Sequence, residues 1–389
     1  MYSLILAVIY LAFISLGLPD SLLGSAWPVM HDALGVSVSY AGVVSMIISI
    51  GTVLSSLLSD RMTKRFSAQV VTAVSVAMTA AALFGFSVSK SFFVLCLWAI
   101  PYGFGAGAVD AALNNYVAIH YSSRHMNWLH CFWGVGCSIS PYIMGFCLTK
   151  NFGWQSGYRT VSIIQTVIFA IIFLSLPLWK KQNKLSDVDE KTEEKPVKMI
   201  DAIKIRGVIF ALTIFFAYCA LEQTAGLWAA TYLVDYCKIN AETAATFASL
   251  FYLGITVGRF LSGFISDRLG DRKIITLGVS MTVFGIVLLA LSFITGVLAL
   301  VGLIIIGLGC APIYPAMIHQ TPVSFGKNNS QAVIGMQMAC AYVGTSFMPP
   351  LFGLIAGNIS VALFPLYLLI FAALILIMCA RLKRAVDNK

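Results

Sequence analysis

The chain has 389 residues, of which 59% are hydrophobic and only 11% are charged, whereas an average soluble domain is about 25% charged. This composition excludes an ordinary soluble protein and indicates about a dozen membrane spans of roughly 20 residues each. The net charge of +9 reflects where Lys and Arg lie relative to these spans, so we expect no nucleic-acid partner.

Apolar segments predict twelve helices, six in each half of the chain. In chain order they cover residues 4–30, 38–60, 67–88, 92–118, 127–149, 157–179, 204–235, 242–266, 274–294, 297–321, 329–357 and 360–381. The one long polar segment has mixed charge and no apolar periodicity, which is typical of a solvated linker. The predicted domains are an N-terminal six-helix bundle (1–179), a cytoplasmic linker (180–203) and a C-terminal six-helix bundle (204–389).

Lys and Arg indicate the orientation of these helices. If both termini are cytoplasmic, the segments on that side hold 20 of the 25 basic residues, which is the asymmetry of the positive-inside rule. We therefore predict an all-α, multi-pass protein of the cell inner membrane with twelve transmembrane helices and both termini in the cytoplasm.

An internal repeat relates the two halves. The pairs Asp60-Arg61 and Asp267-Arg268 lie in the loops predicted after the second and eighth helices, 207 residues apart. The fifth and eleventh helices align at a constant offset of 208, which matches Gly136 with Gly344, Pro141 with Pro349 and Gly145 with Gly353. Two homologous bundles in parallel orientation suit a transporter whose halves rock about a site near the bilayer midplane.

The repeated acid-arginine segments resemble the major facilitator superfamily, and the resemblance extends over nearly the whole chain. The family pattern is Gly, three residues, Asp-Arg, any residue, Gly, any residue, and two basic residues. The second copy fits fully, with Gly263, Asp267, Arg268, Gly270, Arg272 and Lys273. The first copy keeps Asp60, Arg61, Lys64 and Arg65 but has Ser56 and Thr63 in place of the glycines.

Charge pairs at such helix ends can hold one conformation and release it in another. We expect this gating role for six residues, namely Asp60, Arg61, Arg65, Asp267, Arg268 and Arg272. The alternative is that the arginines only fix the topology and face lipid headgroups.

Acidic residues inside the predicted spans are rare, and Asp20, Asp110 and Glu222 are the three that lie well inside. A carboxylate at the bilayer centre costs about 2.5–3.5 kcal/mol on insertion scales, so each is expected to face a partner or a cavity. We predict that Asp110 and Asp20 carry the coupling proton. Because Asp20 follows Pro19, the alternative for it is a helix kink with a solvated acid.

Asp110 shares one helix face with Gly103, Gly107 and Asn114, at spacings of three and four residues. The glycines allow another backbone or a ligand to approach closely. Asn114 and its neighbour Asn115 offer hydrogen-bond donors and acceptors to a hydroxyl-rich solute.

The segment "DAALNNY" resembles the fourth helix of the fucose permease branch, with Asp110, Asn114 and Tyr116 at the matching positions. Asp20 matches the first-helix acid of that branch, and "NWLHCFWGVGCSISPYIMG" resembles its fifth helix. The resemblance implies that the two acids serve proton-coupled sugar uptake. Asp110 is shorter than the Glu of fucose permease, which leaves the substrate geometry open.

The seventh predicted helix contains a second polar group, Glu222, with Gln223 and Trp228 nearby. A sugar can stack on an indole while its hydroxyls bond to an amide and an acid, so these three are predicted substrate-binding residues. Trp228 could instead be an interfacial anchor. Arg259 is the one cation inside a span and is expected to pair with Glu222.

His130 is a candidate for substrate binding or proton transfer, with a purely structural histidine as the alternative, and His319 is equally ambiguous. The sequence has no nucleophile motif, Walker loop or metal-ligand spacing, so we expect neither an enzyme nor a bound cofactor or metal.

These features predict a monomeric secondary transporter that couples a small polar solute, a sugar, to protons by alternating access, with sodium coupling still open. The alternatives are a proton-driven exporter of drugs or metabolites, and a non-transporting sensor on the same scaffold. The fifth helix fits the glycine-proline pattern of exporters poorly, because Ser140 replaces the glycine before Pro141.

Overall fold

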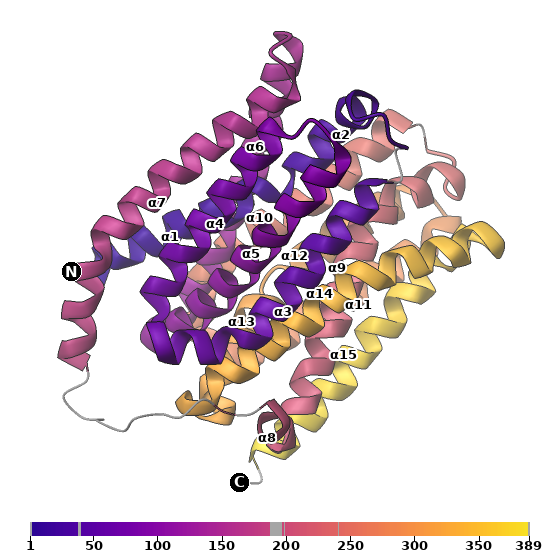
Figure 1. The fold of residues 1–389 in the computed structure, drawn as a ribbon. Coiled ribbons are helices and arrows are strands. Elements are labelled where there is room, and N and C mark those ends of the chain that lie inside the picture. The colour runs from indigo at the N-terminus through magenta and orange to yellow at the C-terminus, as the bar shows by residue number, and fades with distance from the viewer. Residues whose placement is uncertain (1, 38–39, 187–196, 198, 240, 388–389) are drawn as a thin grey trace. The chain divides into compact units, whose positions relative to one another are not determined.

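The computed structural model describes residues 2–37, 40–186, 197, 199–239 and 241–387, and all regular structure within these ranges is helical (Figure 1). The first half contains α1 (Tyr2–Asp20), α2 (Leu22–Ala33), α3 (Ala41–Phe66), α4 (Ala68–Val88), α5 (Phe92–His120), α6 (Ser123–Thr149) and α7 (Gly153–Ser186). The second half contains α8 (Met199–Lys204), α9 (Val208–Asp235), α10 (Ala241–Leu269), α11 (Asp271–Ala290), α12 (Gly296–Cys310), α13 (Ile313–Phe325), α14 (Lys327–Asn358) and α15 (Phe364–Asp387).

The described helices have the length and apolarity of membrane spans. Eleven stretches among them qualify on both grounds, and the 29-residue α10 lies between two of these. Two predicted spans are interrupted: the first between α1 and α2, just after Pro19, and the tenth at Ala311 and Pro312. A proline lies at or next to each break, and it lacks the N–H that would continue the helical hydrogen-bond ladder. The prediction of an all-helical membrane protein is thus confirmed.

The chain divides into two compact units. One comprises Met1–Tyr116 with Leu129–Val197, and the other comprises Val117–Trp128 with Lys198–Lys389. The ends of α5 and α6 that meet at residues 121–122 therefore belong to the second unit, although the rest of each helix belongs to the first. Figure 1 shows α7 as one long helix in the first unit, where it packs along α4, and in the second unit α9 packs along α14.

Close helix contacts recur at equivalent positions in the two units. In the first, a Cβ on Gly136 of α6 would overlap the Ile14 carbonyl of α1. In the second, a Cβ on Gly344 of α14 would collide with the Phe216 carbonyl of α9. Gly136 and Gly344 are the residues that align at the 208-residue offset, so the repeated glycines perform the same packing task in both units.

The acid-arginine segments lie within helices, contrary to the prediction that they form loops. The helix predicted to end at residue 60 continues to Phe66, and the one predicted to end at 266 continues to Leu269. Gly270 then turns the chain with φ 77°, whereas in the first unit the turn residue is Ser67 with φ 68°. Thr63, which occupies the place of Gly270, stays helical because a β-branched residue does not adopt positive φ readily.

The predicted linker is also partly helical. Residues 180–186 extend α7, and Met199–Lys204 form α8, while residues 187–196 and 198 lie outside the described part of the chain. The polar composition of the α7 extension does not prevent a helix, because Lys and Gln are good helix formers.

Candidate functional site

Asp110 lies on α5 in a chain of hydrogen bonds that leads to His130 of α6. Asn114 Nδ2 donates to Asp110 Oδ1 at 2.8 Å and to the Asp110 carbonyl at 3.0 Å. The other side of the same amide, Asn114 Oδ1, lies 3.1 Å from His130 Nε2, which must then carry the hydrogen. All three side chains are buried, Asp110 being 6% exposed, so His130 extends the sequence-predicted pair Asp110 and Asn114 to a chain of three hydrogen-bonded side chains.

Asp20 ends α1 and accepts two hydrogen bonds from aromatic side chains. Tyr102 Oη donates to Asp20 Oδ1 at 3.2 Å, and Trp133 Nε1 donates to Oδ2 at 2.9 Å. Both partners are donors in these contacts, which suits an acceptor carboxylate. Asp20 is exposed and is an electrostatic neighbour of Asp110.

The glycines beside Asp110 contact another backbone. A Cβ on Gly103 would overlap the Ile48 carbonyl of α3, and one on Gly107 would overlap the Thr52 carbonyl. Thr52 and Ser56 of α3 also donate hydrogen bonds to the carbonyls of Gly103 and Gly107, both at 3.2 Å. Of the two possibilities that the sequence left open for these glycines, the structure shows close helix packing.

Glu222 of α9 and Arg259 of α10 form a buried ion pair in the second unit. Arg259 Nη2 lies 3.7 Å from Glu222 Oε1, and the side chains are 5% and 11% exposed. Tyr218 and Tyr252 are electrostatic neighbours of Glu222, and the Tyr252 hydroxyl occupies the space that a side chain at Gly226 would fill. The result is a cluster of one acid, one guanidinium and two phenols, a combination that can bind hydroxyl groups and stack on a sugar ring.

Trp228 points to a different helix from Glu222. Its Nε1 donates to the Pro349 carbonyl of α14 at 2.9 Å, and its ring packs edge-on against Phe352 at a centroid distance of 5.5 Å. Gln223 is half-buried and Asn115 is buried. The structure therefore brings Glu222 and Arg259 together but places Trp228 in the packing between α9 and α14.

Asp267 of α10 holds the beginning of α6. Its carboxylate accepts hydrogen bonds from Ser122 Oγ and from the Arg124 backbone N–H, each at 3.1 Å, and Arg124 Nε lies 3.2 Å from Oδ2. The first N–H groups of a helix have no partner within the helix, and its dipole favours a negative charge there. The carboxylate thus caps α6 from outside, and Trp128 adds a contact to the Phe260 carbonyl of α10 at 3.4 Å.

His319 of α13 makes a second attachment to the same segment. Its Nε2 lies 3.0 Å from the Tyr121 carbonyl and its Nδ1 lies 2.7 Å from Asp271 Oδ2. A carbonyl oxygen can only accept, so Nε2 carries a hydrogen, and one further hydrogen must lie between Nδ1 and the carboxyl group. We call residues 117–128 the docked segment, because Asp267, His319 and Trp128 attach it to α10 and α13.

The other members of the acid-arginine motifs have different contacts. Asp60 is buried, lies 3.1 Å from Lys64 Nζ and accepts a hydrogen bond from the Val197 N–H at 2.9 Å. Arg272 Nη1 pairs with Asp387 Oδ1 at 2.6 Å. The remaining arginines are exposed, and they are Arg61, Arg65 and Arg268.

Sequence reasoning missed the aromatic neighbours of Asp20 and Glu222. Tyr102 and Trp133 lie on helices other than that of Asp20, and Tyr252 reaches Glu222 from α10. One signal was available, because Gly226 marks a place where a neighbouring group approaches the helix closely. No group of three His, Cys, Asp or Glu side chains suited to a metal ion occurs in the described ranges.

The model of the Major Facilitator Superfamily matches residues 9–329, with a second match over residues 210–389. The chain belongs to this superfamily. The resemblance that the acid-arginine motifs indicated is thereby confirmed. The chain is a multi-pass membrane transporter. The family and the relatives are transporters and not enzymes.

Relatives within the superfamily include named sugar transporters. A glucose/mannose transporter of Bacillus subtilis is 23% identical over 350 residues, covering 88% of this chain and 86% of that protein. A hexuronate transporter of the same species is 26% identical over 273 residues, covering 68% and 64%.

Solved structures share the fold of this superfamily member. The transporter FucP in its outward conformation superposes with a TM-score of 0.77 at 15% identity, covering 96% of this chain and 97% of that one. The proton:xylose symporter XylE gives 0.74 at 12% identity, covering 98% and 95%. At these identities the similarity concerns the fold.

Proposed function

We propose that this superfamily member is a proton-coupled symporter of a sugar or a closely related small polar solute, working by alternating access in the cell inner membrane. The observation that carries the proposal is the pair of neighbouring acids in the first unit, Asp20 and Asp110, each held by neutral hydrogen-bond donors. No charged partner neutralises either acid within hydrogen-bond distance among the described contacts. A proton is the simplest species that can do so.

The hydrogen bonds from His130 through Asn114 to Asp110 orient the carboxyl group that takes up the proton. Asn114 keeps its amide oriented by donating to Asp110 while it accepts from His130. When Asp110 is protonated, its carboxyl group can also act as a donor, so the same contacts tolerate both protonation states. Asp20 is exposed whereas Asp110 is buried, so Asp20 is the member of the pair that meets solvent or solute first.

The solute class is supported by the second unit and by the relatives. Glu222, Arg259 and Tyr252 offer acceptors, donors and an aromatic face within one cluster, which matches the chemistry of a sugar. The relatives named for glucose, mannose and hexuronate point the same way. A hexuronate would add a carboxylate for Arg259, while a neutral hexose would leave the ion pair intact.

The docked segment supplies the conformational part of the proposal. Asp267 caps α6 and His319 holds the Tyr121 carbonyl, so separation of the docked segment from α10 and α13 would break charge-assisted hydrogen bonds. Such bonds can hold a carrier in one state and be remade on return. Among the described residues, Asp60 contacts only Lys64 and the Val197 N–H, so we assign the latch to Asp267.

The test is a transport measurement in proteoliposomes. The internal pH is followed while glucose, mannose, galactose or glucuronate is added, for the wild type, Asp110→Asn and Asp20→Asn. The matched control is Asp32→Asn, because the Asp32 side chain is 81% exposed. We expect sugar-dependent acidification of the lumen that is lost in both variants and kept in the control.

Three results would contradict the proposal. Sugar uptake without proton movement would remove the coupling role of Asp20 and Asp110. Proton movement driven by cationic or amphipathic compounds, with none driven by sugars, would favour the exporter, and binding without any transport would favour the sensor.

A further inference from the structure

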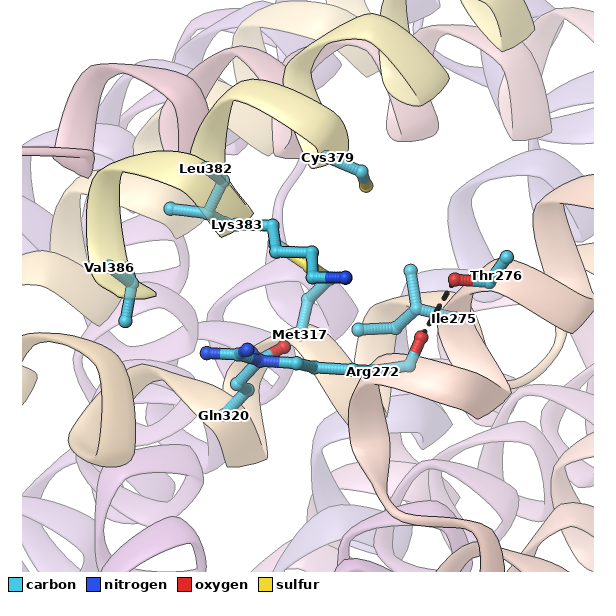
Figure 2. Close-up of a pocket in the computed structure, with 9 residues that line it drawn as sticks. All are labelled: Arg272, Ile275, Thr276, Met317, Gln320, Cys379, Leu382, Lys383 and Val386. Carbon is cyan, nitrogen blue, oxygen red and sulfur yellow. Dashed lines mark hydrogen bonds between the residues drawn. The ribbon is translucent and has the colours of Figure 1, made fainter. Parts of the chain in front are cut away.

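A small pocket in the second unit is lined by none of the residues of the acid clusters. It is formed where α11, α13 and α15 meet (Figure 2), and its volume is about 70 Å³. Figure 2 shows Arg272 of α11 and Lys383 of α15 lying alongside one another across the opening, with Gln320 of α13 beneath them. Two cations and one amide therefore face the same space.

The charges in this pocket are not balanced. Arg272 pairs with Asp387 at 2.6 Å, but Lys383 has no ion-pair partner among the described residues. Thr276 turns its hydroxyl hydrogen to the Arg272 carbonyl at 2.9 Å, so the donors left for a ligand are the rest of the guanidinium, the ammonium and the Gln320 amide. Donors without acceptors around a cavity favour an anion.

The size of the pocket limits that anion. A water needs about 10–15 Å³ of such space, so 70 Å³ holds roughly five water-sized atoms. This is the size of a phosphate group and is too small for a hexose ring. Arg recognises phosphate oxygens through its planar fork of N–H groups, and Lys adds a point charge.

The position of the pocket suits a lipid. Arg272 is the second residue of α11, and Lys383 lies one turn before the end of α15, so both are at the boundary of their candidate spans. The exposed side chains Leu277 and Ile377 lie farther along the same helices, where acyl chains would run. Basic pockets between spans are a known means of binding anionic headgroups.

We propose that this pocket binds a phosphate group, held by Arg272, Lys383 and the Gln320 amide. In the absence of a ligand, Asp387 forms an ion pair with Arg272. The Asp387 carboxylate therefore competes with the phosphate group for the Arg272 guanidinium. The phosphate comes either from an anionic lipid headgroup or from a free phosphate in solution, and the two sources require the same donors.

Binding is measured on the purified full-length chain in detergent micelles, by thermal unfolding at constant ionic strength. The additions are sodium phosphate, phosphatidylglycerol, or phosphatidylcholine, whose choline cation offsets the phosphate charge, each compared with sodium chloride. A rise in melting temperature with phosphatidylglycerol alone identifies a lipid site, and a rise with sodium phosphate identifies a site for free phosphate. No rise with either overturns the proposal.

Three variants assign the binding to this pocket. Lys383→Gln should weaken binding about tenfold, because one charge-assisted hydrogen bond is lost. Arg384→Gln is the matched control, since Arg384 is exposed on the same helix and does not line the pocket. Asp387→Asn should tighten binding by up to about fivefold, because an exposed ion pair no longer competes.

Equal weakening in Lys383→Gln and Arg384→Gln would mean a diffuse charge effect and would refute the site. None of these measurements depends on transport, so failure here leaves the symport proposal standing, and failure of symport leaves the pocket standing.

Discussion

Neutralising Glu222 should lower the free energy of unfolding of the second unit. Neutralising Arg259 in the same protein should restore much of that lost stability. The two charges lie 3.7 Å apart on side chains that are 5% and 11% exposed. At this separation Coulomb's law with an effective dielectric constant of about 20 gives roughly 4.5 kcal/mol. Removing one member of a buried pair destabilises by about 3–5 kcal/mol, because the other charge is left uncompensated. We expect a loss of this size in Glu222→Gln.

The double variant Glu222→Gln/Arg259→Gln leaves no buried charge, so it should recover at least half of that loss. The assay is equilibrium unfolding of the purified chain in detergent micelles, applied to the four proteins of a double-mutant cycle. Asp235→Asn, at the exposed end of the same helix, is the control and should change the free energy of unfolding by less than about 0.5 kcal/mol. If the two single losses simply add, the ion pair does not stabilise the unit and the reasoning fails.

Three further predictions concern packing, backbone strain and the docked segment. Gly107→Ala should destabilise the first unit by about 1–3 kcal/mol, because its Cβ overlaps the backbone of α3; Gly145→Ala, with nothing near its Cβ, should be neutral or stabilising in the same unfolding assay. Ser67→Gly should raise stability by about 1 kcal/mol, because φ is 68° there, whereas Ser89→Gly, at φ −68°, should not; a gain at both positions would argue against strain. Asp267→Asn should speed amide hydrogen exchange at the beginning of α6 about tenfold by mass spectrometry, and unchanged exchange would mean that the cap is dispensable.

Much of the fold could be predicted, because a membrane span leaves a simple signal. A run of about 20 apolar residues has few alternatives to a transmembrane helix, and the predicted segments coincide with helices in the structure. The positions at which the helices end were predicted less accurately. Polar residues around Asp60 suggested a loop, but helix formers such as Met62 and Lys64 continue α3 until Ser67, since Thr63 does not provide the turn that Gly270 provides in the second unit.

The candidate sites could be predicted only where a contact is local. Asp110 and Asn114 are four residues apart on one helix, so their hydrogen bond follows from helical spacing. The partners of Asp20 are 82 and 113 residues away in the sequence, and no periodicity within one helix indicates them. Trp228 was predicted to bind a sugar from the chemistry of its indole ring, and the contacts of that ring with α14 could not be predicted from the sequence.

The docked segment attaches the N-terminal half of the sequence to the second unit through side-chain contacts, in addition to the continuous polypeptide chain. Residues 117–128 belong to the second unit although they lie in the first third of the sequence. A polypeptide cut between residues 187 and 196 would therefore yield two fragments that each retain part of the second unit. The smaller fragment would bring its own docking peptide, so the fragments could reassemble without any engineered dimerisation tag, and the strength of that reassembly would report directly on Asp267 and His319.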